Sequence, residues 1–432
     1  MDRSDLPLRS GLLRFATAGS VDDGKSTLIG RLLYDSKSLL ADQVTAIEAA
    51  SRKRGLADVD LSLLTDGLIA EREQGITIDV AYRYFATPAR KFVIADSPGH
   101  AQYTRNMVTA ASTADVAVLL VDAERGLQTQ TWRHALLSSW VGIRSIVLAV
   151  NKMDRVGWSL ERFRELSGAF AAFAGSLGFE EIVAIPMSAL KGDMVVERGT
   201  HLDGYTGPTL LEALETAPSR HDVLAARGPA AFRFPVQRVV RVPRGQGQPD
   251  APAEDFRGLQ GTVASGAVRV GDAVVVAGNG TGARVARILR LDREAAVAQA
   301  EQAVTLVLDA ELDVSRGDLL AAASQRPEGL RSVDAELCWF DAEPQVPDRH
   351  YLLKHATRTV RATMAAPSER IDVESLARVP ADRPLAMNDI GRVQVSVQQP
   401  LPFEPYAAQR VTGAFILVDE ITHRTVGAGV VR

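Results

Sequence analysis

The chain has 432 residues, of which 46% are hydrophobic and 24% are charged, and its formal net charge is −4. This is the composition of an ordinary globular protein, so it excludes disorder over the whole length, and the length allows about two to four domains. The 49 Lys and Arg residues nearly balance 53 Asp and Glu residues, which argues against a protein that mainly neutralises nucleic-acid phosphates. The single cysteine, Cys338, excludes an intrachain disulfide and a cysteine-rich metal site and fits a reducing compartment.

The first residues of the chain carry no export signal. Residues 1–10 are polar and charged, and no uncharged apolar segment follows them. The strongest apolar run, residues 116–121, is far shorter than the about 20 residues that span a bilayer. We therefore expect no membrane association and a cytoplasmic location.

The first half of the chain alternates strand-like and helix-like patterns. A helix is predicted over residues 159–177, where Leu and Phe recur at spacings of three and four, with Ser159 as N-cap and Arg162 where a full capping box needs Glu or Gln. Short apolar runs rich in Val and Ile indicate parallel strands buried on both faces. Together they predict a doubly wound, mostly parallel α/β sheet. The strand-like runs are residues 12–18, 92–95, 116–121, 146–150 and 182–187.

The pattern changes near residues 218–229, after which strand-like runs and glycine-containing turns dominate. Residues 245–253 read as a solvated loop, and a second all-β stretch begins near Val333. Many short strands with turn signals favour barrels, so we expect an α/β domain followed by two all-β barrel domains. The predicted domains are residues 1–222, 223–328 and 329–432. The strand-like runs are residues 232–240, 261–264, 273–276, 304–308, 358–363, 392–397 and 413–431.

A phosphate-binding loop is predicted directly after the first strand. Residues 19–26 match G-x-x-x-x-G-K-[ST] and lie between a strand-like run and a helical pattern, the context that this motif requires. Backbone N–H groups of such a loop point at phosphate oxygens, Lys25 reaches the β- and γ-phosphates and Ser26 ligates Mg²⁺. The alternative is a glycine turn that matches by chance. The candidate residues are Gly19, Ser20, Val21, Asp22, Asp23, Gly24, Lys25, Ser26 and Thr27.

A second phosphate motif follows the run at residues 92–95. Asp96 at the end of a buried strand is well placed for Mg²⁺, directly or through water, and Gly99 can offer its N–H to a γ-phosphate. Ser97 and Pro98 complete the turn, and taken alone the segment reads as a plain Pro-Gly turn. His100 is a candidate for orienting water, with a surface histidine as the alternative.

Two further motifs indicate a guanine site. Asn151, Lys152, Met153 and Asp154 follow a strand-like run, and the Asp154 carboxylate can accept from the N1–H and the exocyclic amine of guanine. Adenine offers no matching donors on that edge, so the carboxylate would lose its partners. Lys152 can lie over the base, and Asn151 can tie this loop to the phosphate loop. The backbone of Ser188, Ala189 and Leu190 can also meet the guanine edge, although a plain turn is nearly as good a reading of that short string alone.

Thr77 lies between the first predicted helix and the second strand. It is a candidate for the mobile loop that closes on Mg²⁺ and the γ-phosphate. From the local sequence alone, a β-branched strand residue is the better reading.

With these motifs the sequence resembles translation-factor-type GTPases and, within them, the large GTPase subunits of bacterial sulfate adenylyltransferase. The phosphate and guanine motifs specify only a GTPase, whereas residues 66–82 and the strings in the predicted barrels point to the sulfate-activation branch. One departure is Ser97, where the family usually has Thr; the hydroxyl is kept. A second departure is the segment 241–254, which is longer than the connection that the family usually has at this place. The segments that carry the resemblance are residues 19–35, 66–82, 102–107, 188–193, 233–237, 255–258, 315–320 and 426–429.

The resemblance implies that the chain binds and hydrolyses GTP with Mg²⁺. A separate small catalytic subunit would hold ATP and sulfate and make adenylyl sulfate and pyrophosphate, and GTP hydrolysis would drive this uphill transfer. By position, Ser26 and Thr77 would ligate Mg²⁺, Asp96 would bind it through water and His100 would position the attacking water. No second phosphate-loop motif follows residue 217, so we expect no fused kinase domain.

Two other functions remain compatible with the shared fold. A translation GTPase that binds aminoacyl-tRNA or the ribosome is disfavoured by the balanced charge and by the sulfate-branch segments. Co-purification with a small ATP-binding subunit rather than with ribosomes or tRNA would discriminate the two. A generic ATPase would not prefer GTP over ATP in competition.

Overall fold

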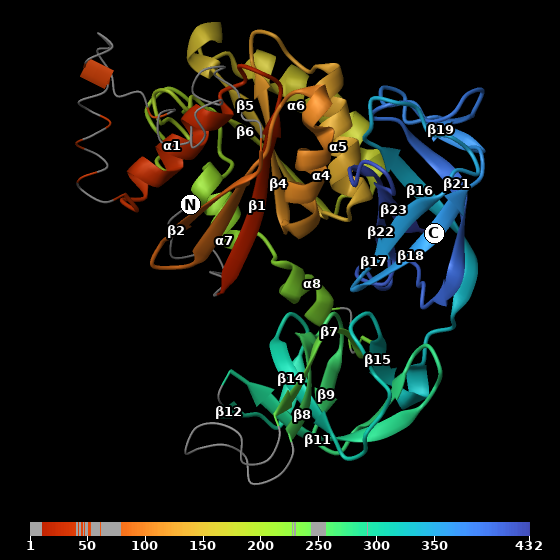
Figure 1. The fold of residues 1–432 in the computed structure, drawn as a ribbon. Helices are drawn as coiled ribbons and strands as arrows, with labels where there is room; N and C mark the ends of the chain where they lie inside the picture. Colours follow the sequence, from red (N-terminus) through yellow and green to blue (C-terminus); the bar gives the residue numbers. More distant parts are fainter. Residues whose placement is uncertain are drawn as a thin grey trace. The chain divides into compact units, whose positions relative to one another are not determined.

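The structure, a computed structural model, describes residues 11–39, 42, 45, 47, 51–52, 61, 79–226, 228, 230–242, 256–291 and 293–432. The chain forms two compact units (Figure 1). The first comprises Met1–Val223 and Val373–Leu376, and the second comprises Leu224–Asp372 and Ala377–Arg432. The domain boundaries expected after residues 222 and 328 remain predictions.

The first unit is built on a six-stranded sheet in the order β2-β3-β1-β4-β5-β6. Neighbours from β3 to β6 are parallel, and only β2 at the edge runs antiparallel to β3. Every residue of β4 and β5 is buried, as expected of parallel strands covered on both faces. The five apolar runs of the sequence therefore became the five parallel strands. The bounds are β1 (Leu12–Gly19), β2 (Ala81–Ala86), β3 (Lys91–Asp96), β4 (Val116–Asp122), β5 (Ser145–Asn151) and β6 (Glu181–Pro186).

Helices cover both faces of this sheet. Figure 1 shows α1 on one side of the sheet and α4, α5 and α6 on the other. The Ser159 side chain accepts from the Arg162 N–H at 3.2 Å and so caps α6, as predicted, and a 3₁₀ turn continues the helix to Leu177. The bounds are α1 (Lys25–Asp35), α4 (Thr104–Thr113), α5 (Thr129–Trp140), α6 (Leu160–Ala174), α7 (Leu210–Thr216) and α8 (Arg220–Ala226).

The second unit begins with a closed antiparallel barrel. Strands β10-β15-β7-β8-β14-β11 pair in this order, and the pairing of β10 with β11 closes the ring, with β12 appended. Closure leaves these strands without free edges. The bounds are β7 (Arg233–Val242), β8 (Phe256–Thr262), β9 (Ala267–Arg269), β10 (Ala273–Val276), β11 (Gly282–Arg290), β12 (Arg293–Glu294), β13 (Val297–Gln299), β14 (Ala303–Leu308) and β15 (Leu319–Ala322).

A second closed barrel follows. Its order is β16-β23-β22-β17-β18-β21, and β16 also pairs with β21 to complete the ring, to which β19 and β20 are added. The α/β sheet followed by two antiparallel barrels confirms the predicted fold class. The bounds are β16 (Leu330–Trp339), β17 (Tyr351–His355), β18 (Arg358–Met364), β19 (Glu369–Ile371), β20 (Arg378–Pro380), β21 (Ile390–Leu401), β22 (Ala414–Asp419) and β23 (Thr425–Val431).

A buried ion pair joins the two barrels. The Arg233 guanidinium on β7 donates to the Glu404 carboxylate at 2.9 and 2.7 Å, and the Thr412 hydroxyl donates to the same carboxylate at 2.7 Å. The side chain of Arg233 is only 4% exposed. Two donors in a fixed fork satisfy the carboxylate well, as a buried pair requires.

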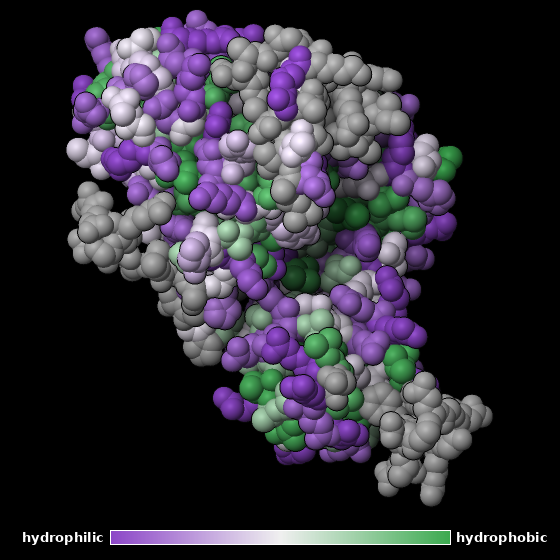
Figure 2. All heavy atoms as spheres, turned by 90° about the vertical axis from the view of Figure 1, so that its left-hand side faces the viewer, coloured by the Kyte–Doolittle hydropathy of each residue, from purple (hydrophilic) through white to green (hydrophobic). Residues whose placement is uncertain are grey.

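The surface of the described residues carries few large apolar groups. On the face drawn in Figure 2, hydrophilic residues predominate and hydrophobic ones occur in small groups. Exposed large side chains such as Tyr84 and Ile421 lie far apart in the sequence. Among the residues that the structure describes, no helix combines the length and hydropathy needed to cross a membrane.

Candidate nucleotide site

The predicted phosphate loop forms a tight turn between β1 and α1. Gly24 has φ +95°, a conformation that favours glycine, and an added Cβ there would lie 2.5 Å from the amide nitrogen of Asn151. The Ser20 N–H donates to the Asp23 carboxylate at 2.6 Å, which closes the turn. Both the backbone geometry and the close approach of Asn151 therefore require glycine at position 24.

Lys25 is buried at the start of α1. Its Nζ donates to the carbonyl oxygens of Gly19 and Ser20 at 2.8 and 3.0 Å. Burial lowers the pKa of Lys25, and the nearby carboxylates of Asp96 and Asp23 partly oppose this shift. An ammonium held in a low-dielectric site beside a helix N-terminus is well suited to bind phosphate oxygens.

The second phosphate motif packs directly against the first. The Asp96 carboxylate, only 2% exposed, accepts from the Thr17 hydroxyl at 3.2 Å, and the Ser97 hydroxyl donates to the Thr17 carbonyl at 2.6 Å. An added Cβ on Gly99 would lie 2.4 Å from the Gly19 carbonyl oxygen. The Ser97 hydroxyl is thus used inside the fold, which explains why replacing the family's usual Thr preserves this turn.

His100 lies one residue beyond this contact. It precedes the short 3₁₀ helix Ala101–Tyr103, is partly buried, and packs edge-on against Tyr103 with ring centroids 6.3 Å apart. His100 therefore lies beside the turn of the second motif, and its role in orienting water stays a prediction.

The guanine motif lies at the end of β5, which is two strands after β3 in the sequence. The Asn151 side chain donates to the Asp23 carbonyl at 2.8 Å and accepts from the Ala189 N–H at 2.9 Å. One amide therefore joins the phosphate loop to the predicted Ser188–Leu190 segment. Asp154 lies partly buried in the following 3₁₀ turn, Met153–Val156.

The turn after β6 is closed by its own backbone and by Ser188. The Ser188 N–H donates to the Asp193 carbonyl at 3.2 Å, and the Gly192 N–H donates back to the Ser188 carbonyl at 2.8 Å. The Ser188 hydroxyl accepts from the Lys191 N–H at 3.2 Å. The carboxyl ends of parallel strands meet at one edge of a sheet, and at this edge the turn contacts Asn151 and, through it, the phosphate loop.

At the end of β4 the sequence analysis missed two site residues, Asp122, which is the last residue of the strand, and Arg125, which follows it. Asp122 accepts from the Lys152 ammonium at 2.7 Å, and Arg125 donates to the Val21 carbonyl at 3.2 Å. A carboxylate at the end of a buried strand was a usable signal for Asp122. Arg125 had none, because its contact depends on how the loops fold together.

Thr77 and most of residues 66–82 lie outside the residues that the structure describes, as does most of residues 241–254. Within the described part of the chain, no three His, Cys, Asp or Glu side chains converge as a metal cage would require. A cation at this site would therefore rely on few protein oxygens and on phosphate oxygens, which is common for Mg²⁺.

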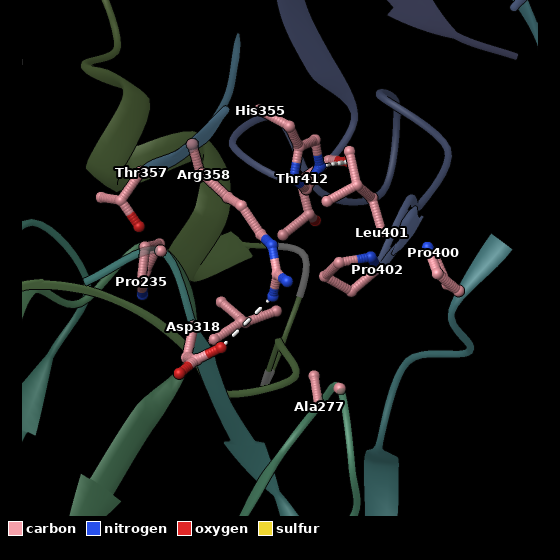
Figure 3. A pocket seen from close by; sticks show the side chains of 14 residues that line it. Pro235, Ala277, Asp318, His355, Thr357, Arg358, Pro400, Leu401, Pro402 and Thr412 are labelled. Atoms are coloured by element: carbon pink, nitrogen blue, oxygen red, sulfur yellow. Dashed lines mark hydrogen bonds and ion pairs between the residues drawn. The ribbon is translucent and has the colours of Figure 1, made fainter. Parts of the chain in front are cut away.

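A pocket also lies at the junction of the two barrels (Figure 3). Arg358 points toward Asp318 with a 3.3 Å contact, and the His355 ring pairs with the Thr412 carbonyl at 2.8 Å. Arg358 also donates to Gln399 at 2.8 Å. Because these polar groups bind one another, the pocket is part of the contact between the barrels, and we assign it no ligand.

Comparison with known proteins agrees with this geometry. Residues 10–219 match the family model of the elongation factor Tu GTP binding domain, and residues 332–432 match the GTP-eEF1A C-terminal domain-like family. Sulfate adenylyltransferase subunit 1 of Methylorubrum extorquens (strain PA1) is 50% identical over 423 residues, covering 98% of this chain and 87% of that protein.

Longer relatives show the same similarity. The bifunctional enzyme CysN/CysC of Mycobacterium tuberculosis is 49% identical over 97% of this chain and 67% of its own length. The bifunctional enzyme NodQ of Rhizobium sp. (strain N33) is 50% identical over 98% of this chain and 64% of its own length. This chain thus spans about two thirds of the length of these bifunctional relatives. It belongs to the translation-factor-type GTPase family, in the branch that contains sulfate adenylyltransferase subunit 1.

Proposed function

We propose that this chain is the GTPase subunit of a sulfate adenylyltransferase, acting in sulfate assimilation in the cytoplasm. GTP hydrolysis here drives a partner subunit to make adenylyl sulfate and pyrophosphate from ATP and sulfate. The observation that carries the proposal is the pair of hydrogen bonds by which Asn151 joins the phosphate loop to the Ser188–Leu190 turn. The similarity to proteins named sulfate adenylyltransferase subunit 1 supports the substrate class.

The phosphates of GTP would bind between the two glycine-containing turns. Gly24 lets the phosphate loop pack against Asn151, and Gly99 lets the second turn pack against Gly19, so the two turns lie close enough together to share one phosphate group. Lys25 would exchange its carbonyl partners for the β- and γ-phosphates, which relieves the cost of burying its charge. Thr27, next to Ser26 at the start of α1, adds its N–H to this helix terminus.

The donors near the γ-phosphate position fit Mg²⁺. Ser26 would offer a hydroxyl oxygen, and the buried Asp96 carboxylate would act through water. Thr77 lies outside the described residues, and we expect it to supply a second hydroxyl from its place in the sequence alone. When bound, Mg²⁺ neutralises charge that develops on the transferred phosphoryl group. The Asp96 carboxylate accepts from the Thr17 hydroxyl at 3.2 Å, and this contact fixes its orientation.

Hydrolysis would depend mainly on positioning and charge stabilisation. His100 would orient the attacking water, and Thr77 would ligate Mg²⁺. No arginine that could act as a finger is identified in the sequence, so isolated turnover should be slow. We expect a small catalytic subunit, with its ATP and sulfate, to accelerate GTP hydrolysis in the heterodimer.

The proposal is tested by measuring adenylyl sulfate formation from ATP and sulfate with the small subunit alone, with this chain, and with this chain plus GTP. Formation that rises only when chain and GTP are both present supports the proposal. Formation that is independent of GTP contradicts it. Association of the purified chain with ribosomes or tRNA instead of a small ATP-binding subunit would favour a role in translation.

A further inference from the structure

Arg31 joins the phosphate-binding helix to the turn that follows β6. It lies six residues after Lys25 on α1, where its Nε donates to the Ala189 carbonyl at 3.2 Å and its Nη2 donates to the Leu190 carbonyl at 2.6 Å. Asp35, one turn further along α1, lies 3.6 Å from the same guanidinium. Two successive carbonyls of the turn are therefore bound by one side chain.

These contacts fix the direction of the Ala189–Leu190 peptide. No cis peptide bond occurs in the described residues, and in a trans peptide the C=O and the N–H point to opposite sides. Because Arg31 binds the Ala189 carbonyl, the Leu190 N–H is directed away from α1. Among the hydrogen bonds formed between described residues, none uses this N–H.

The neighbouring peptide is also held. The Ala189 N–H donates to Asn151, whose amide binds the Asp23 carbonyl of the phosphate loop. The contacts thus form a closed circuit from the phosphate loop through α1, Arg31 and the Ala189 turn, and back through Asn151. A circuit of this kind fixes the distance between the phosphate and base subsites, which favours binding because less order must be created when the ligand arrives.

We propose that Arg31 is a positioning residue for base recognition: it orients the Leu190 N–H so that this group donates to the oxygen at position six of a purine. The inference rests on the proposed guanine site. Adenine carries an amine at position six, so an N–H aimed there would meet another donor and stay unsatisfied. Arg31 thereby adds a second means of rejecting adenine to the one supplied by Asp154.

The experiment compares dissociation constants of three nucleotides for the full chain and its variants. GDP and 6-thio-GDP differ only at position six, where sulfur is the weaker acceptor, so their affinity ratio measures the N–H contact. GDP and IDP differ only in the exocyclic amine, so their ratio measures recognition by Asp154. For the unsubstituted chain we expect a GDP over 6-thio-GDP preference of about fivefold, as one neutral hydrogen bond provides.

In Arg31→Ala we expect the GDP over 6-thio-GDP preference to fall to about one while the GDP over IDP preference is retained. A purely structural role would weaken all three nucleotides together and leave both ratios unchanged, which overturns the inference. An unsubstituted chain that prefers GDP over IDP but does not distinguish GDP from 6-thio-GDP also overturns it. If the unsubstituted chain prefers GDP over neither IDP nor ADP, the proposed guanine site itself fails.

Two variants control for charge and for folding. Arg31→Lys keeps the positive charge beside Asp35 but lacks the fork of donors, so an intermediate ratio is expected even if Arg31→Ala folds poorly. Asp35→Asn removes the ion pair and leaves the donors of Arg31 in place, so its ratios should match those of the unsubstituted chain. A loss in Asp35→Asn as large as in Arg31→Ala would assign the effect to local charge and overturn the inference.

Discussion

The Lys152 ammonium lies 2.7 Å from the carboxylate of Asp122, and the Asp122 side chain is only 2% exposed. The same carboxylate accepts from the Glu124 N–H at 2.8 Å, so its orientation is fixed from the backbone. Lys152 itself has φ +61°, a conformation uncommon for residues other than glycine. Asp122 therefore holds a side chain that belongs to the guanine motif.

Replacing Asp122 by Asn should weaken GDP binding roughly tenfold, because a charge-assisted hydrogen bond that positions Lys152 is lost. Isothermal titration with GDP would measure the change. Glu124→Gln is the matched control, since among the described residues the Glu124 side chain pairs with the exposed Arg155 alone and its replacement should leave binding unaltered. Equal binding by both variants would contradict the role of Asp122.

The stability supplied by this pair should depend on pH. Burial alone would raise the pKa of Asp122, but the hydrogen bond from Lys152 and those from backbone N–H groups lower it below the ordinary value of 3.8. A carboxylate whose pKa is lowered by folding stabilises the folded state at pH values above its ordinary pKa of 3.8. This contribution is lost as the pH falls through the folded-state pKa. Urea unfolding at pH 7 and at progressively lower pH should show the difference from Asp122→Asn shrinking below pH 3.8.

Lys25→Met should nearly abolish GTP binding while stabilising the nucleotide-free protein, because the burial that lowers the pKa of Lys25 disfavours its charge in the folded state. The pKa of Lys25 is lowered, so the folded chain binds fewer protons than the unfolded chain, and the gain should shrink as the pH rises toward 10.5. Nucleotide titration and thermal unfolding measure the two effects. Lys91→Met, at the exposed start of β3, is the control and should change neither GTP binding nor stability. Retained GTP binding in Lys25→Met would count against the phosphate site.

Asp154→Asn should shift base preference from guanosine toward xanthosine nucleotides, because xanthine presents a carbonyl where guanine has its amine. Competition between GDP and XDP for the variant and for the unsubstituted chain would show the shift. Asp203→Asn, at an exposed position, serves as control. An unchanged preference in Asp154→Asn would exclude the carboxylate as the group that reads the base.

Thr77→Ala should lower the rate of GTP hydrolysis at saturation far more than it weakens GTP binding, since the proposed contact of the Thr77 hydroxyl with Mg²⁺ would matter most in the transition state. Single-turnover hydrolysis and equilibrium binding separate the two. Thr113→Ala, at the exposed end of α4, should leave both unaltered. A variant that loses binding and turnover equally would remove Thr77 from the proposed catalytic group.

Glu404→Ala should destabilise the two-barrel unit by about 3–5 kcal/mol, because the Arg233 charge would be left buried and unpaired. Replacing both partners, as Arg233→Met with Glu404→Leu, should cost far less. Denaturant unfolding followed by the fluorescence of the buried Trp339 would report the change. If Glu404→Ala lowers the free energy of unfolding no more than the double substitution does, the ion pair adds little to the contact between the barrels.

The parallel strands were predicted well because burial on both faces makes their sequence almost uniformly apolar. The run at residues 116–121 became β4 (Val116–Asp122) and the run at residues 146–150 became β5 (Ser145–Asn151). Strands as short as β12 (Arg293–Glu294), whose residues are both exposed, carry no such pattern. Their pairing is decided by neighbours in the barrel and not by local sequence.

The phosphate loop, the second phosphate motif, Asn151 and the turn at Ala189 contact one another because each lies at the carboxyl end of a parallel strand, and such strand ends share one edge. Arg31 and Arg125 were missed because their contacts are long-range. Arg31 contacts a turn 158 residues away, and such a contact depends on the packing of α1 against that turn. No local spacing encodes it, and Arg31 alone on a helix reads as an ordinary surface residue.

The closure of the second barrel has a consequence for how this part of the chain is made. β16 pairs with β21 and β23, both of which follow it much later in the sequence. During synthesis, β16 can pair with β21 once residue 401 has emerged, but the edge that faces β23 keeps unpaired backbone groups until residues 425–431 emerge. This interval is when the barrel is most exposed to aggregation, and slow synthesis across residues 402–424 would prolong it.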